Sequence, residues 1–365
     1  MASISRGVDR VLAKCEACIK AGNFYEAHQM FRTVYFRYSG QQKYDDAADL
    51  LYRGALILLQ HKQVCMFQYS SGADLSLLLL DVLNKSQTPV TSDTLNQITH
   101  LFEKMDPECP DRYPYLAKAI SWSKKINKDH KRGHPDLHQR FGVIFWHERN
   151  YTQARYHYIH STDGEGCAQM LLEFHTTHGY PSEVDLFITQ AVLQYLCLQN
   201  KATANVCFEV YTQRHPGIDT GPPYSLPLLN FLWLLLIALE GGKLPVFTVL
   251  CEKYQVSISR DPNYKEYLDQ IGQMFFGVPP PQKTPQGIFG SLLQNVLGSA
   301  FDEDDEDGNS PDSSSQTGGS SNRQNFNSRV MSGATSPFLP SGSNSSLSTP
   351  TGSKPNKIEK ALDLD

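Results

Sequence analysis

Apolar positions in residues 1–280 recur at spacings of three and four, which predicts a series of amphipathic helices. Near the start of the chain the pattern predicts two helices within residues 8–38, separated by Gly22-Asn23. Strand signals are almost absent. Only Val256-Ser257-Ile258-Ser259 alternates briefly, as half of a small hairpin would. The pattern therefore predicts an all-α fold.

The most apolar stretch of the chain is 227–239, which predicts a core helix covered on several sides. A membrane-spanning helix needs about 20 apolar residues. This run ends at Glu240-Gly241-Gly242, so we expect a buried helix and no direct membrane insertion. Pro227 suits its first turn, and Gly241 suits the left-handed position just beyond its end.

An aromatic–alanine pattern indicates how the helices pair. Phe24-x-x-Ala27-x-x-x-Phe31 is typical of the second helix of a tetratricopeptide-type hairpin. It recurs loosely at Tyr44-x-x-Ala47-x-x-x-Leu51 and at Tyr151-x-x-Ala154-x-x-x-Tyr158, with no fixed period. We therefore predict a degenerate array of helical hairpins, a right-handed α-α superhelix.

The character of the chain changes after Gly277. Val278-Pro279-Pro280-Pro281 ends the predicted array, which occupies residues 1–280. Residues 281–300 are predicted to be a linker with one short amphipathic helix, whose apolar positions are Ile288, Phe289, Leu292, Leu293, Val296 and Leu297. Residues 301–365 are acidic and rich in serine and glycine, which predicts a disordered tail.

Charge and cysteine content narrow the classes of partner and compartment. The whole chain has a formal net charge of −5, and the residues from Phe301 onward account for all of it. A neutral folded body disfavours nucleic acid as a partner, because phosphate binding needs surplus Lys and Arg. The eight cysteines are scattered, and no signal peptide is evident, so we expect reduced thiols and a cytosolic protein.

The sequence contains few residue patterns that are typical of an active site. Cys15-x-x-Cys18 lacks a second ligand pair and lies on an apolar helix face, so both thiols are expected to be core residues. His134 and His138 have the spacing of a zinc helix, but the adjacent glutamate is missing and Pro135 puts His134 at the helix start. We expect no enzyme, cofactor or metal. A metal-dependent enzyme built on His134 and His138 remains an alternative.

A set of segments in order along residues 10–280 resembles the Golgi-to-ER traffic protein 4 family. They include Tyr25-Glu-Ala-His-Gln-Met30, Gly133-His-Pro-Asp-Leu-His138, Asp163-Gly-Glu-Gly-Cys167, Pro227-Leu-Leu-Asn-Phe231 and Phe275-Phe-Gly-Val-Pro279. The resemblance implies a non-enzymatic cytosolic adaptor in the insertion of tail-anchored membrane proteins. It implies that residues 1–150 dock the homodimeric targeting ATPase. Residues 151–280 would dock a ubiquitin-like protein and a BAG-domain scaffold that handles mislocalised hydrophobic proteins.

Under this resemblance the sequence suggests contact residues for both partners. For the ATPase they are Arg32, Arg37 and Lys43, at or beside the second helix. For the ubiquitin-like partner and scaffold they are the apolar residues near the end of the array, Phe247, Val249, Leu250, Tyr254, Tyr267 and Phe275. A direct chaperone that cradles client transmembrane segments is a further alternative, although its expected Met-rich groove is not evident in seven dispersed methionines.

Overall fold

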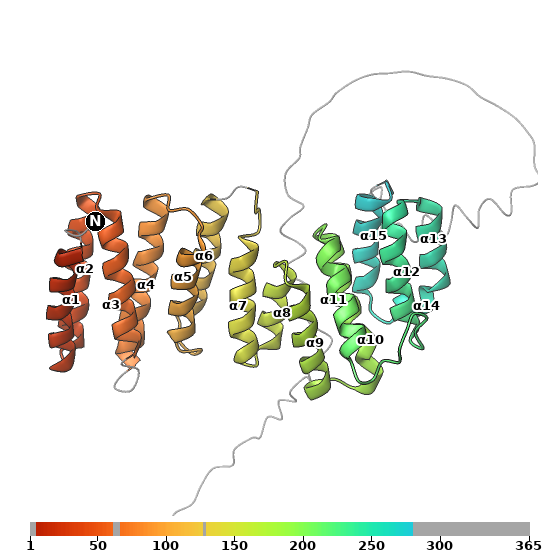
Figure 1. The fold of residues 1–365 in the computed structure, drawn as a ribbon, viewed down its shortest axis with the longest axis horizontal. Coiled ribbons are helices and arrows are strands. Elements are labelled where there is room, and N and C mark those ends of the chain that lie inside the picture. Colours follow the sequence, from red (N-terminus) through yellow and green to blue (C-terminus); the bar gives the residue numbers. More distant parts are fainter. Residues whose placement is uncertain (1–4, 61–65, 127–128, 280–365) are drawn as a thin grey trace, which may run out of the picture. The chain divides into compact units, whose positions relative to one another are not determined.

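The computed structural model describes residues 5–60, 66–126 and 129–279, which lie in one compact unit of the chain. These residues form fifteen α-helices and one 3₁₀ turn, and contain no strand, which confirms the prediction of an all-α fold (Figure 1). The helices are α1 (Ser5–Lys20), α2 (Phe24–Gly40), α3 (Tyr44–Gln60), α4 (Met66–Lys85), α5 (Ser92–Lys104), α6 (Arg112–Ile126), α7 (Pro135–His147), α8 (Tyr151–Ile159), α9 (Gly164–His178), η1 (Pro181–Glu183), α10 (Val184–Cys197), α11 (Lys201–Arg214), α12 (Pro227–Gly241), α13 (Leu244–Lys253), α14 (Gln255–Ile258) and α15 (Asn263–Phe275).

Neighbouring helices pack as hairpins that form two layers in the first half of the chain. Helices α1, α3, α5 and α7 contact one another in sequence, and α2, α4 and α6 do the same. In each copy of the aromatic–alanine pattern, the alanine and the large residue four positions later are buried. The small residues allow close approach: a Cβ on Gly54 of α3 would lie 2.7 Å from the Phe31 ring of α2. The predicted helical-hairpin packing is therefore confirmed.

Helix α10 is the most enclosed element, rather than the predicted core helix α12. None of the residues of α10 is exposed, and α8, α9, α11, α12 and α15 all contact it. Helix α15, much later in the chain, packs against α10. Arg260 approaches the buried Asp185 to 2.6 Å, and the Tyr264 hydroxyl donates to the Leu186 carbonyl at 3.2 Å. In α12, by contrast, Ile237 is exposed.

Two local predictions were wrong. Helix α12 includes Gly241, and the left-handed position is taken by Gly242, whose φ is +59° and whose N–H donates to the Ala238 carbonyl. The helix thus extends two residues further than its apolar run. Residues 256–258 lie in helix α14 instead of a strand. A stretch of four residues fits one turn of a helix as well as it fits a short strand. The pattern was therefore too short to distinguish the two.

The predictions for residues 281–300 and 301–365 lie outside the described residues. Helix α7 packs against α8 and α8 against α9, so helix packing continues across residue 150. The assignment of 1–150 and 151–280 to different partners stays a prediction. No helix among the described residues combines the length and hydropathy that a membrane crossing requires.

Candidate functional site

The outer face of α2 carries large aromatic side chains in contact with water. Tyr25 is 77% exposed and Phe36 is 59% exposed, with Arg32 between them. Spacings of seven and four residues place all three on one side of the helix. Asp74 of α4 lies beside Arg32. We call these four residues the α2–α4 surface.

Asp74 fixes the polar part of the α2–α4 surface. Its carboxylate accepts from His28 Nε2 at 2.8 Å, and Arg32 Nη1 lies 3.1 and 3.2 Å from its two oxygens. Burial opposes ionisation of Asp74, but the His28 hydrogen bond and the Arg32 charge outweigh it and lower the pKa of Asp74. The Arg32 guanidinium also lies 5.9 Å from the Phe36 ring. The guanidinium is thus held in place next to an exposed aromatic ring.

The three predicted ATPase contacts do not form one patch. Arg37 is exposed on α2, but it lies five positions after Arg32, so the two side chains leave the helix about 140° apart. Arg37 lies over the ring of Tyr38, at 5.5 Å. Lys43 is exposed and immediately precedes α3. Only Arg32 belongs to the α2–α4 surface. Sequence reasoning missed Tyr25 and Phe36, although their spacing with Arg32 was a readable signal.

Most of the residues predicted to bind the C-terminal partner pack within the chain itself. Phe247 and Leu250 are buried, which contradicts the expectation that they form an exposed apolar end. The chain covers Phe247 after α15, where Phe276 stacks on it with ring centroids 4.5 Å apart. Tyr267 is half-buried and its hydroxyl accepts from Gln194 at 3.1 Å.

Tyr254 and Phe275 are also half-buried, and Tyr254 lies 5.8 Å from the ring of Phe231. Val249, at 52% exposed, is the one residue of the predicted set that is open to solvent. Val246 (49%) on α13 and Val256 (88%) on α14 are exposed as well. We call Val246, Val249 and Val256 the α13 stripe. Ile237 of α12 is also half exposed.

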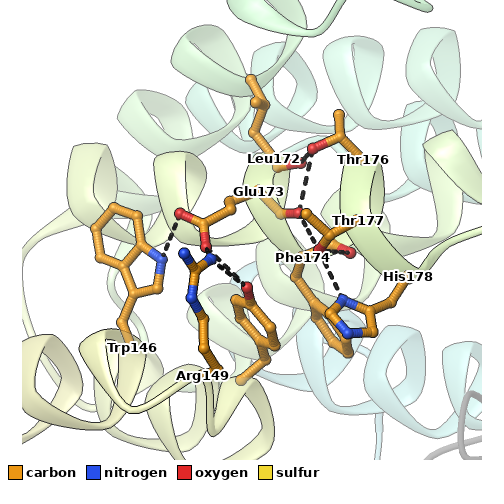
Figure 2. Close-up of polar contacts among 9 residues, drawn as sticks. Trp146, Arg149, Leu172, Glu173, Phe174, Thr176, Thr177 and His178 are labelled. Atoms are coloured by element: carbon orange, nitrogen blue, oxygen red, sulfur yellow. Dashed lines mark hydrogen bonds and ion pairs between the residues drawn. The ribbon is translucent and has the colours of Figure 1, made fainter. Parts of the chain in front are cut away.

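A polar cluster joins the α7–α8 turn to α9. Figure 2 shows Glu173 between Trp146 and Arg149; its carboxylate accepts from Trp146 Nε1 at 3.1 Å and forms an ion pair with Arg149. The Tyr151 hydroxyl donates to Glu173 Oε1 at 2.7 Å. The Tyr151 ring stacks on Phe174, with centroids 4.7 Å apart. Arg149 has a φ of +61°, so the turn holds a non-glycine residue in the left-handed region. Both oxygens of Glu173 are satisfied, and the cluster acts as a structural joint.

Two buried histidine pairs are held as neutral tautomers by backbone groups. The Arg132 carbonyl can only accept, so His138 Nε2 donates to it (3.1 Å) and His138 Nδ1 accepts from His157 Nδ1 (3.0 Å). In the second pair the Gly217 N–H donates to His215 Nδ1 (3.0 Å). His215 Nε2 therefore donates to His175 Nδ1 at 2.8 Å.

These contacts remove the support for a metal site on His134 and His138. Both ring nitrogens of His138 are engaged within the protein, while His134 is the N-cap of α7 and accepts from the Asp136 N–H. The two side chains therefore serve different local contacts. No group of three or more His, Cys, Asp or Glu side chains in the described part of the chain is placed to hold a metal ion.

Comparison with known proteins gives one consistent result. Residues 41–297 match the family model described as Golgi to ER traffic protein 4. The Golgi to ER traffic protein 4 homolog of Xenopus tropicalis is 52% identical over 83% of this chain and 91% of the relative. The homolog of Homo sapiens is 50% identical over 82% of this chain and 90% of the relative. The crystal structure of C. therm. Get4 is similar with a TM-score of 0.69 and 27% identity, over 84% of this chain and all of that chain.

Proposed function

This chain belongs to the Golgi to ER traffic protein 4 family, and on that premise we propose that it is a non-enzymatic cytosolic adaptor for tail-anchored membrane proteins. In this role it bridges the homodimeric targeting ATPase to a ubiquitin-like protein and a BAG-domain scaffold, in a complex that also handles mislocalised hydrophobic proteins. The observation that carries the proposal is that large apolar side chains are exposed on α2, near the start of the helix series, and on α13, near its end. They include Tyr25 and Phe36 on α2, and Val246 and Val249 on α13.

The α2–α4 surface is the proposed ATPase contact. Exposed aromatic side chains and a positioned arginine are the residue types that supply most of the binding free energy in protein interfaces. Arg32 is already held by Asp74, so less side-chain entropy is lost when it binds. The charged part of such a contact speeds association and weakens with salt, whereas the aromatic part does not.

The test is binding of the purified full chain to the homodimeric ATPase by biolayer interferometry at 50 and 300 mM salt. We expect Phe36→Ala to weaken binding at least tenfold at both salt concentrations, and Arg32→Glu to weaken it more at low salt than at high salt. Tyr113→Ala, which removes an exposed aromatic ring from α6, is the matched control and should have no effect. Arg37→Glu and Lys43→Glu test the two contacts predicted from sequence. Full affinity in the Phe36 and Arg32 variants would contradict the proposal for this surface.

The α13 stripe is the proposed contact for the ubiquitin-like protein and the scaffold. An apolar contact should depend weakly on salt, unlike the charged part of the ATPase contact. Val249→Glu places a charge on the exposed stripe without disturbing the buried Phe247 and Leu250. We expect it to weaken capture of the ubiquitin-like protein at least tenfold while ATPase binding is unchanged. Equal capture by Val249→Glu and the parent chain would remove the stripe from this interface.

A further inference from the structure

The α13 stripe consists of three exposed valines on α13 and α14. Val246 and Val249 are three residues apart on one side of α13, and Val256 follows on α14. The inner side of the same segment carries Phe247 and Leu250, which are buried. Among the described helices α13 packs mainly against α12 and α14, which leaves the stripe uncovered.

The course of the chain after α15 brings its next residues to α13. Beyond Phe275 the backbone turns at Gly277, whose φ is +69°. The Val278 N–H then donates to the Gly272 carbonyl at 3.1 Å. Phe276 stacks on Phe247 of α13, and Val278 is buried. The described chain therefore ends, at Pro279, next to the helix that carries the stripe.

The chain that follows contains an apolar segment within reach. Residues 288–297 have apolar side chains at spacings of one, three and four, and carry no charged residue. Eight residues separate this segment from Pro279, and they span up to about 28 Å when extended. A helix is about 10 Å across, so this linker is long enough to cross α13.

One further observation favours this segment as the occupant. The match to the family model does not stop with α15 but continues to residue 297, the last apolar position of the segment, before the acidic run begins.

We propose that residues 288–297 of the same chain pack on the α13 stripe and cover Val246, Val249 and Val256. This contact lies within one chain and does not depend on the proposed function. It makes the segment a competitor of any partner that binds Val249, so such a partner must displace it.

The test is photo-crosslinking in the full chain with Val249→p-benzoylphenylalanine, a change at an exposed position. An equal mixture of unlabelled and ¹⁵N-labelled chains distinguishes contacts within a chain from contacts between copies. We expect a crosslink to the tryptic peptide 284–323, localised by fragmentation to 288–297, with both halves carrying the same isotope. Crosslinks between unlabelled and labelled chains would instead identify a second copy as the occupant and overturn the proposal. Crosslinks only to other parts of the chain, or none, would also overturn it.

Paired variants in the same background separate a specific contact from general stickiness. Leu292→Ser with Leu293→Ser should reduce the crosslink at least fivefold. Phe338→Ser with Leu339→Ser makes a similar change further along the chain and should leave the yield unchanged. Equal yields from the two variants would contradict the proposal. Circular dichroism of each variant checks that the helical body is intact.

Discussion

Phe276 stacks on Phe247 with ring centroids 4.5 Å apart and ring planes within 15° of parallel. Phe247 lies on α13 and Phe276 follows the last residue of α15, so this pair joins α13 to the end of the helix series. Gly272 makes room for the pair, because a Cβ there would lie 3.1 Å from both Phe247 and Val278. The chain itself thus covers much of the apolar end of the helix series, which the sequence suggested would bind a partner.

Phe247→Ala should lower the free energy of unfolding by about 3–5 kcal/mol, because it removes a buried aromatic ring and leaves a cavity beside Phe276. Urea denaturation followed by circular dichroism measures the change. Val249→Ala is the matched control on the same helix, and should change stability by less than about 0.5 kcal/mol because Val249 is exposed. Similar losses of unfolding free energy in both variants would show that α13 does not bury Phe247 and expose Val249.

Val249 and Phe247 also show how much of the structure could be predicted from the sequence. The apolar spacing in residues 1–280 predicted a series of helices, and α13 is one of them. The same spacing did not predict which apolar residues face inward, because Phe247 is covered by Phe276, which comes after α15 in the chain. The α2–α4 surface illustrates the same limit. Arg32 was selected for its charge, but its ion pair with Asp74, 42 residues away, could not be predicted from local spacing.

Stability should fall as pH drops from about 6.5 toward 4. Burial lowers the pKa of His138 and of His215 from 6.5 to about 4, and it also lowers the pKa of His157. In this window the unfolded chain takes up protons that the folded chain does not, so unfolding is favoured as pH falls. Between pH 7.5 and 5.0 we expect a loss of about 2 kcal/mol from each of His138 and His215, measured by urea denaturation.

His215→Gln removes one titrating group but keeps an amide N–H near the position of Nε2. We expect the acid-induced loss to shrink by about 2 kcal/mol in this variant. His178→Gln, at an exposed position of α9, is the control and should retain the full pH dependence. A free energy of unfolding that is constant between pH 7.5 and 5.0 would show that the buried histidines are not neutral in the folded chain.

Glu173→Ala should destabilise the joint between the α7–α8 turn and α9. The substitution leaves the half-buried Trp146 N–H and the Tyr151 hydroxyl without their acceptor, which costs about 1–3 kcal/mol. The melting temperature, measured by calorimetry, should fall accordingly. Glu209→Ala on the exposed face of α11 controls for the loss of one glutamate and should have little effect. If the two variants melt at the same temperature, the cluster shown in Figure 2 does not stabilise the joint.

Gly164 gives a physical reason for one of the segments by which the family was recognised. It is the first residue of α9, and a Cβ there would lie 2.6 Å from the Thr203 carbonyl oxygen and 3.1 Å from the Cys207 nitrogen of α11. Both are backbone atoms, so the contact cannot be relieved by moving a side chain. Gly164→Ala must push α9 away from α11. We expect it to lower the free energy of unfolding by about 1–3 kcal/mol in urea denaturation.

Gly40→Ala is the matched control for this last prediction, because Gly40 lies at the end of α2 and nothing lies within 4 Å of its added Cβ. Alanine has the higher helix propensity, so Gly40→Ala should be neutral or stabilise the chain by up to about 1 kcal/mol. The two substitutions are chemically identical and differ only in their surroundings. Opposite signs for the two changes would attribute the effect of Gly164 to the close approach of α9 and α11, and equal signs would exclude that explanation.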